Sequence, residues 1–94
     1  MKELTEERKY EYWNHFVSWV FFNKLKWFTP RRMEKVVFSI WKSREFWEKA
    51  LLRYGGEYQT PEQMKRTNRR NYFDMMQDME ALVKEKCEQL FLPR

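Results

Sequence analysis

Apolar residues recur at offsets of three and four along most of the 94-residue chain, as they do in helices that bury one side. No segment shows sustained strand-like alternation. The apolar stripes comprise Trp13, Phe16, Val17, Val20, Phe21 and Phe28, then Met33, Val36, Val37, Ile40, Trp41, Trp47, Leu51 and Tyr54, and finally Tyr72, Met75, Met76, Met79, Val83 and Leu90. The pattern predicts an all-α fold.

Capping residues predict where these helices begin and end. Thr29 and Thr60 each precede a proline, which is favoured at the first helical position, and Gln63 completes a capping box with Thr60. Gly55 can take the left-handed conformation that ends a helix. Acidic residues after Thr5 suit a helix start. We therefore expect helices over 6–27, 30–54 and 61–91.

The second stripe is interrupted at a position that should face inward. Arg44 occupies this position, and Ser43 can cap a new helix. We therefore expect a compact bundle of three long helices, or of four if the second breaks near Ser43. Residues 1–94 should form one domain, because the chain has no internal repeat and no long linker.

Because the chain has only one Cys and one His, most metal-binding and catalytic sites are excluded. A structural zinc needs four Cys or His ligands, and a catalytic zinc usually has three protein ligands. Neither a Gly-rich phosphate loop nor a common hydrolase motif is present. His15 as a base, or Cys87 as a nucleophile, would need partners placed beside it. We expect no enzymatic activity, no catalytic residues, no metal, no cofactor and no small-molecule substrate.

The chain also lacks the marks of export or membrane insertion. Its first residues are acidic rather than basic and apolar, and the strongly apolar run 16–22 is far shorter than the roughly 20 residues of a spanning helix. The Trp and Lys residues of 19–28 are also typical of interfacial membrane helices. The well-capped helices that follow favour a packed domain instead. A single thiol fits a reducing compartment, so the predicted location is cytoplasmic, without a membrane partner.

The net charge of +5 is concentrated in residues 29–71, which carry eleven Lys or Arg against five Asp or Glu. Lys65, Arg66, Arg69 and Arg70 would share one face of the expected helix over 61–91. Arginine binds phosphate through two parallel donors, and Asn68 can add hydrogen bonds. The sequence thus predicts a phosphate-contacting face. The alternatives are a solvated face, or salt bridges to the acidic Glu3, Glu6 and Glu7.

A second basic group comprises Arg31, Arg32 and Lys35 at the start of the expected helix over 30–54. Positive charge there opposes the helix dipole, so these residues are not placed for local stability. They could form a second anchor for nucleic acid. The alternative is that Glu34 and other carboxylates screen them.

The first helix has more aromatic residues than one side can bury. Tyr12, Trp19 and Phe22 lie opposite its apolar stripe. Either this helix is buried on two sides, or these residues form an exposed patch that binds a protein partner or stacks on bases.

The predicted function is therefore non-enzymatic binding to a nucleic acid, RNA or DNA, or to a nucleoprotein complex. A narrower version, based on size and charge alone, is a phage or mobile-element inhibitor or accessory factor of an RNA-guided or DNA-processing nuclease. The rival function is a helical protein-protein adaptor or homodimer that uses Tyr12, Trp19 and Phe22. A helix-turn-helix is disfavoured, because the segment between Tyr54 and Pro61 is longer than the usual turn.

Overall fold

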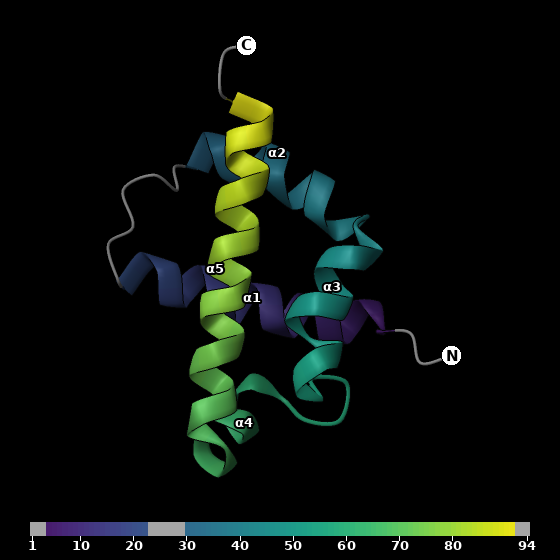
Figure 1. The fold of residues 1–94 in the computed structure, drawn as a ribbon, viewed down its shortest axis with the longest axis vertical. Coiled ribbons are helices and arrows are strands. Elements are labelled where there is room, and N and C mark those ends of the chain that lie inside the picture. The colour runs from purple at the N-terminus through teal and green to yellow at the C-terminus, as the bar shows by residue number, and fades with distance from the viewer. Residues whose placement is uncertain (1–3, 23–29, 92–94) are drawn as a thin grey trace.

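The computed structural model describes residues 4–22 and 30–91, which are almost entirely helical (Figure 1). The helices are α1 (Glu6–Phe22), α2 (Pro30–Trp41), α3 (Arg44–Ala50), the 3₁₀ helix η1 (Leu52–Tyr54), α4 (Pro61–Thr67) and α5 (Arg69–Phe91). The all-α prediction is confirmed for this part of the chain. The predicted bundle of three or four helices is not confirmed, because the described residues form five α-helices.

Three predicted boundaries are confirmed, two by hydrogen bonds and one by backbone conformation. The Ser43 hydroxyl accepts from the Phe46 amide at 3.2 Å, so the second helix does break there. Thr60 and Gln63 form both bonds of the capping box, at 3.2 and 2.9 Å. Gly55 follows η1 with φ 75°, a left-handed conformation that favours glycine.

A fourth boundary was missed, because the expected helix over 61–91 is divided at Asn68. The Asn68 amide donates to the Met64 carbonyl at 2.8 Å, which closes α4. Its side-chain oxygen accepts from the Asn71 amide at 3.2 Å, which caps the start of α5. One residue therefore ends one helix and begins the next.

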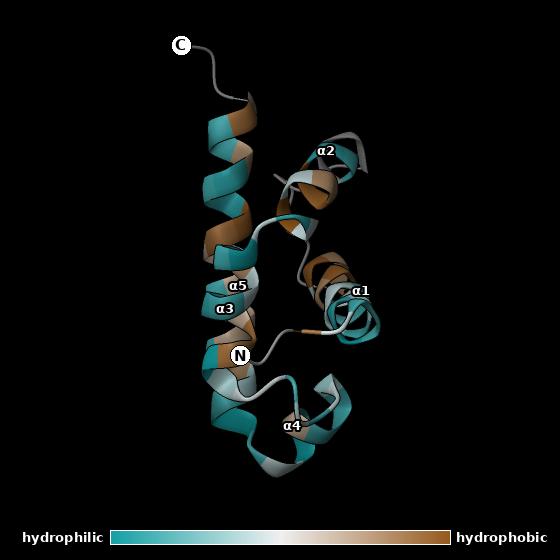
Figure 2. Cartoon of the chain, turned by 90° about the vertical axis from the view of Figure 1, so that its right-hand side faces the viewer, coloured by the Kyte–Doolittle hydropathy of each residue, from teal (hydrophilic) through white to brown (hydrophobic). Residues whose placement is uncertain are grey.

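The helices form two layers, and α5, the longest of them, lies in the first (Figures 1 and 2). Helix α3 lies beside α5, while α1 crosses it in the second layer together with α2. Helix α4 lies at the N-terminal end of α5, at an angle to it, and contacts α1. The result is a flat molecule whose shortest dimension is 18 Å, close to two helix diameters.

Every α-helix contributes to one hydrophobic core, and no charged side chain is buried in the described part of the chain. The buried residues are Leu4, Tyr12, Trp13, Phe16, Val20, Val36, Ile40, Phe46, Trp47, Ala50, Leu51, Met64, Tyr72, Met75, Met76, Met79, Val83 and Cys87. Two residues of the predicted stripes are exposed instead, namely Phe21 at 80% and Leu90 at 46%. Phe28 lies outside the described residues, and so does the side chain of Met33.

Candidate nucleic-acid interface

Four cationic side chains surround the turn between α4 and α5, and we call them the basic elbow: Lys65, Arg66, Arg69 and Arg70. The first two lie in the last turn of α4 and the other two in the first turn of α5, and all four are exposed. They therefore do not share the face of one helix, as the sequence predicted. The turn at Asn68 still keeps them close, since Lys65, Arg66 and Arg69 line a shallow hollow together with Glu62.

No side chain of the basic elbow forms an ion pair with a described residue. Five other Lys or Arg side chains do, over 2.6 to 3.9 Å: Arg8 with Glu11, Lys9 with Glu6, Arg44 with Glu48, Lys49 with Glu45, and Arg53 with Asp78. Lys42, Lys84 and Lys86 form no such pair either, so what distinguishes the elbow is that four cations without an ion pair to a described residue lie together.

The expected alternative of salt bridges to the N-terminal acids is not what the structure shows. Glu6 pairs with Lys9 at 3.5 Å and accepts a hydrogen bond from the Trp41 indole, and Glu7 forms no ion pair with a described residue. Glu3 lies outside the described residues. In addition, Arg69 and Arg70 oppose the dipole at the start of α5, at a cost of about 0.3–1 kcal/mol each. Local stability therefore does not explain the elbow.

Next to the basic elbow, a row of three polar side chains in contact with one another joins three helices. His15 of α1 lies between Glu62 of α4 and Tyr72 of α5, with Nδ1 3.3 Å from the Glu62 carboxylate and Nε2 2.5 Å from the Tyr72 hydroxyl. A carboxylate can only accept, so in the neutral imidazole Nδ1 carries the proton and donates to Glu62, while Nε2 accepts from Tyr72. The Lys65 amine lies 5.9 Å from the centre of the Tyr72 ring.

Burial favours the neutral forms of the His15 and Tyr72 side chains. It lowers the pKa of His15, an effect that the nearby Glu62 carboxylate opposes, and it raises the pKa of Tyr72. The Tyr72 side chain is only 3% exposed, so its hydroxyl does not reach solvent as a nucleophile would. His15 does have partners beside it, and their contacts join α1 to α4 and α5.

An aromatic side chain on α5 extends the surface. Phe73 is 49% exposed and follows Arg69 by four residues, so the two lie on the same side of the helix. Helical periodicity did not single out Phe73, because this residue belongs to no apolar stripe. Its position outside the stripe could still have identified it, since an aromatic residue on the polar side of a helix and one turn from an arginine lies at the surface.

The second basic group is not part of this surface. Lys35 is exposed on α2, whereas the side chains of Arg31 and Arg32, in the first turn of α2, lie outside the described residues. Helix α2 packs towards the C-terminal end of α5, and α4 lies at its N-terminal end (Figure 1). The fold therefore separates the two basic groups along the length of α5.

The three aromatic residues predicted for a protein interface do not form one patch. Tyr12 is fully buried, and its hydroxyl donates to the Gln59 carbonyl at 2.7 Å, so that prediction is wrong for Tyr12. The loop before α4 covers this side of α1. Trp19 is half-buried and stacks on Phe16 with ring centres 6.2 Å apart. Of the three, Phe22 alone is exposed, at 80%.

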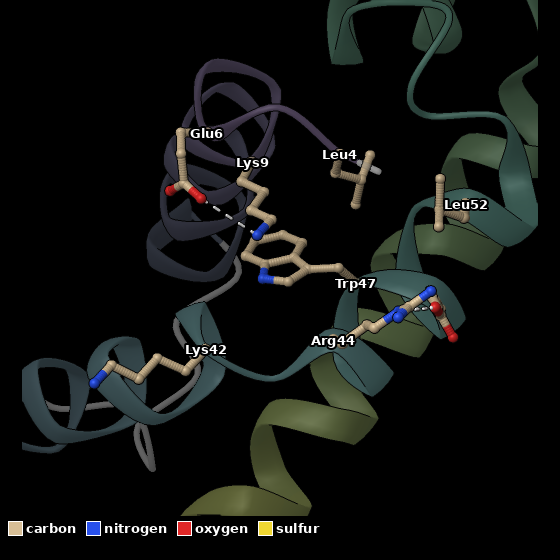
Figure 3. Close-up of a pocket in the computed structure, with 8 residues that line it drawn as sticks. Leu4, Glu6, Lys9, Lys42, Arg44, Trp47 and Leu52 are labelled. Atoms are coloured by element: carbon tan, nitrogen blue, oxygen red, sulfur yellow. Dashed lines mark hydrogen bonds and ion pairs between the residues drawn. The ribbon is translucent and has the colours of Figure 1, made fainter. Parts of the chain in front are cut away.

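A separate hollow of about 240 Å³ lies between the start of α1 and α3 (Figure 3). Four of its five charges are paired, because Lys9 pairs with Glu6 above the Trp47 ring and Arg44 pairs with Glu48, while Lys42 forms no ion pair with a described residue. Its volume is below the 300–1,000 Å³ of ordinary ligand sites. It is therefore a weaker candidate than the basic elbow.

Other kinds of site receive no support from the described residues. Among them, no group of three or more His, Cys, Asp or Glu side chains could hold a metal ion, and Cys87 is 5% exposed. None of the helices over 4–22 and 30–91 is both long and apolar enough to cross a membrane. Nothing matches the chain among protein-family models, curated proteins or solved structures.

Proposed function

We propose that this protein binds nucleic acid, RNA or DNA, through the basic elbow and without catalysing a reaction. The observation that carries the proposal is that four neighbouring cations are exposed and form no ion pair with a described residue, whereas Arg8, Arg44, Lys49 and Arg53 each do. Three of the four are arginines, whose planar guanidinium groups suit phosphate. Phosphate contacts are the main source of affinity in sequence-independent binding.

Phe73 favours single-stranded over double-stranded nucleic acid as the ligand. Proteins that bind single strands combine a basic groove with aromatic side chains on which bases stack. Phe73 is exposed on the same side of α5 as Arg69. The bases of a duplex are stacked on one another and are not available to such a ring.

The first experiment compares two variants of equal charge in titrations of labelled single strands followed by fluorescence anisotropy. One variant changes the basic elbow to Gln (Lys65→Gln, Arg66→Gln, Arg69→Gln, Arg70→Gln). The control changes three arginines and one lysine that have ion-pair partners (Arg8→Gln, Arg44→Gln, Lys49→Gln, Arg53→Gln). We expect the elbow variant to bind at least about tenfold more weakly than the control at 50 mM salt.

Equal affinities of these two variants would show that net charge alone accounts for binding. Absence of any binding by the unmodified protein at low salt would refute direct contact with nucleic acid. Circular dichroism would establish that both variants retain their helices, as expected because exposed ion pairs contribute only about 0–1 kcal/mol each.

The stacking role of Phe73 is tested by Phe73→Ala. Loss of one stacked base costs about 1–3 kcal/mol, so single-strand affinity should fall by roughly fivefold or more while duplex affinity changes little. Phe21→Ala is the matched control, because Phe21 is an exposed phenylalanine on a different helix. An equal loss on single strands and duplexes would contradict stacking.

The adaptor function retains one supporting observation, the exposed Phe22. An adaptor should tolerate the elbow variant and lose its partner on Phe22→Ala. Capture of partners with and without nuclease treatment distinguishes the two functions, and it also tests the narrower prediction of a nuclease inhibitor or accessory factor.

A further inference from the structure

The side of α2 that faces away from the core carries an apolar strip. Val36 and Ile40 are buried against the core, and at 100° per residue Phe38 lies opposite them. Phe38 is 68% exposed and lines a shallow groove. We call the residues that line this groove the outer face of α2: Glu34, Val37, Phe38, Trp41 and Lys42.

Helix α1 enlarges this apolar surface. Tyr10 is 62% exposed, and its ring meets that of Trp41 edge to face, with centres 6.5 Å apart. Phe38 and Tyr10 are therefore two large aromatic residues exposed on neighbouring helices. Contiguous exposed apolar surface of this kind marks interaction sites.

The charges on the outer face are arranged symmetrically about Phe38. Glu34 precedes Phe38 by four residues, and Lys42, the residue after the end of α2, follows it by four. All three line the same groove, so they lie on one side. Neither charge forms an ion pair with a described residue, although the Lys42 amine lies 4.5 Å from the centre of the Phe38 ring. If two such helices cross antiparallel at Phe38, each Glu34 lies opposite the Lys42 of the other copy.

We infer that the outer face of α2 is the interface of a symmetric homodimer, in which two copies of α2 pack antiparallel across Phe38. A twofold interface uses the same patch on both subunits and must be complementary to itself. Opposite charges at equal distances on either side of an exposed apolar centre meet this requirement, and a second copy of the chain satisfies both charges at once.

The dimer should be weak, because α2 has 12 residues and is therefore only about 18 Å long. A short helix pair buries less than the roughly 1,200 Å² of a stable interface. We therefore expect a dissociation constant of about 10 μM or weaker.

Charge exchange tests both the interface and its direction. In sedimentation equilibrium of the full chain up to about 1 mM, Glu34→Lys or Lys42→Glu alone should weaken the dimer by about fivefold or more, because each places like charges opposite one another. The double variant Glu34→Lys, Lys42→Glu should restore the dimer to within about twofold. Phe38→Ala should weaken it about tenfold, whereas the control Phe73→Ala should have no effect.

A protein that is monomeric at 1 mM would overturn the inference. So would a double variant as weak as the single variants, since only antiparallel pairing about Phe38 predicts the rescue. Phe38→Cys provides a second measurement, because a disulfide traps copies that associate only transiently. Two copies of this cysteine meet at the twofold axis, so mild oxidation with diamide should link them, while Phe73→Cys should remain unlinked. Equal linking of both variants would contradict the proposed axis.

Discussion

His15 is the residue that connects the candidate site to the rest of the molecule. It contacts α4 through Glu62 and α5 through Tyr72 while belonging to α1. Because burial lowers the pKa of its imidazole, the folded protein favours the neutral ring. Protonation would add a positive charge beside Lys65 and remove the acceptor for the Tyr72 hydroxyl.

This arrangement predicts a pH-dependent stability. An unfolded histidine has a pKa of about 6.5, and the folded value is lower, so the unfolded chain binds more protons between the two values. The stabilisation is complete above about pH 6.5 and decreases as the pH falls through the lowered pKa. In urea unfolding at pH 7.5, His15→Gln should lower the free energy of unfolding by about 0.5–1.5 kcal/mol. Between pH 7.5 and 5.5, this free energy should fall less in the variant than in the unmodified protein.

Keeping the measurement above pH 5.5 limits the contribution of carboxylates such as Glu6. The Trp41 hydrogen bond lowers the pKa of Glu6, so its stabilisation is lost at more acidic pH. Parallel pH profiles for His15→Gln and the unmodified protein would exclude His15 as the titrating group.

Tyr12 and Phe21 show where prediction from residue pattern ends. Both lie on α1, and helical periodicity placed Phe21 in the core and Tyr12 opposite it. The structure reverses this, because the loop carrying Gln59 covers Tyr12, while Phe21 remains 80% exposed. Tertiary structure determines which side of a helix is covered by a loop that is distant in the sequence. Periodicity along one helix contains no information about it.

At the scale of helices, boundaries that depend on local capping could be predicted from the sequence. Ser43, Thr60 and Gly55 act within three or four residues of the boundaries they define. The break at Asn68 was missed although asparagine is a good capping residue. Met64 and Tyr72 are both buried and eight residues apart, so the apolar pattern continues through the break as it would in one helix.

Asn68 is expected to maintain the geometry of the basic elbow. Asn68→Ala removes the cap of α5 and should lower the free energy of unfolding by about 1 kcal/mol, measured by urea denaturation. It should also weaken nucleic-acid binding, since Lys65 and Arg69 lie on either side of it. Asn68→Ser retains a capping oxygen and should recover most of both losses. If Ser and Ala behave alike, the cap does not hold the elbow.

At the scale of the whole molecule, the two proposed surfaces are separate. The basic elbow lies where α4 meets α5, and α2 packs towards the other end of α5 (Figure 1). A dimer formed through the outer face of α2 therefore leaves both elbows accessible. Two elbows on one dimer could engage the same strand, which raises apparent affinity without any new contact.

The concentration of basic residues in the middle of the sequence could be recognised without a structure, but its division into two groups could not. Lys65 and Lys35 are both exposed, yet they belong to helices at opposite ends of α5. Their separation depends on how α2 and α4 pack against α5, and sequence spacing does not determine that packing.

The most direct test of the central claim is the salt dependence of nucleic-acid binding. Four phosphate contacts on a single strand predict that the logarithm of the association constant falls with the logarithm of the salt concentration with a slope of about −3. We expect this slope for the unmodified protein and for the control in which the ion-paired bases Arg8, Arg44, Lys49 and Arg53 are changed to Gln. Changing the basic elbow to Gln should make the slope shallower by about 3. An unchanged slope in the elbow variant would contradict the proposal that these four side chains contact phosphate.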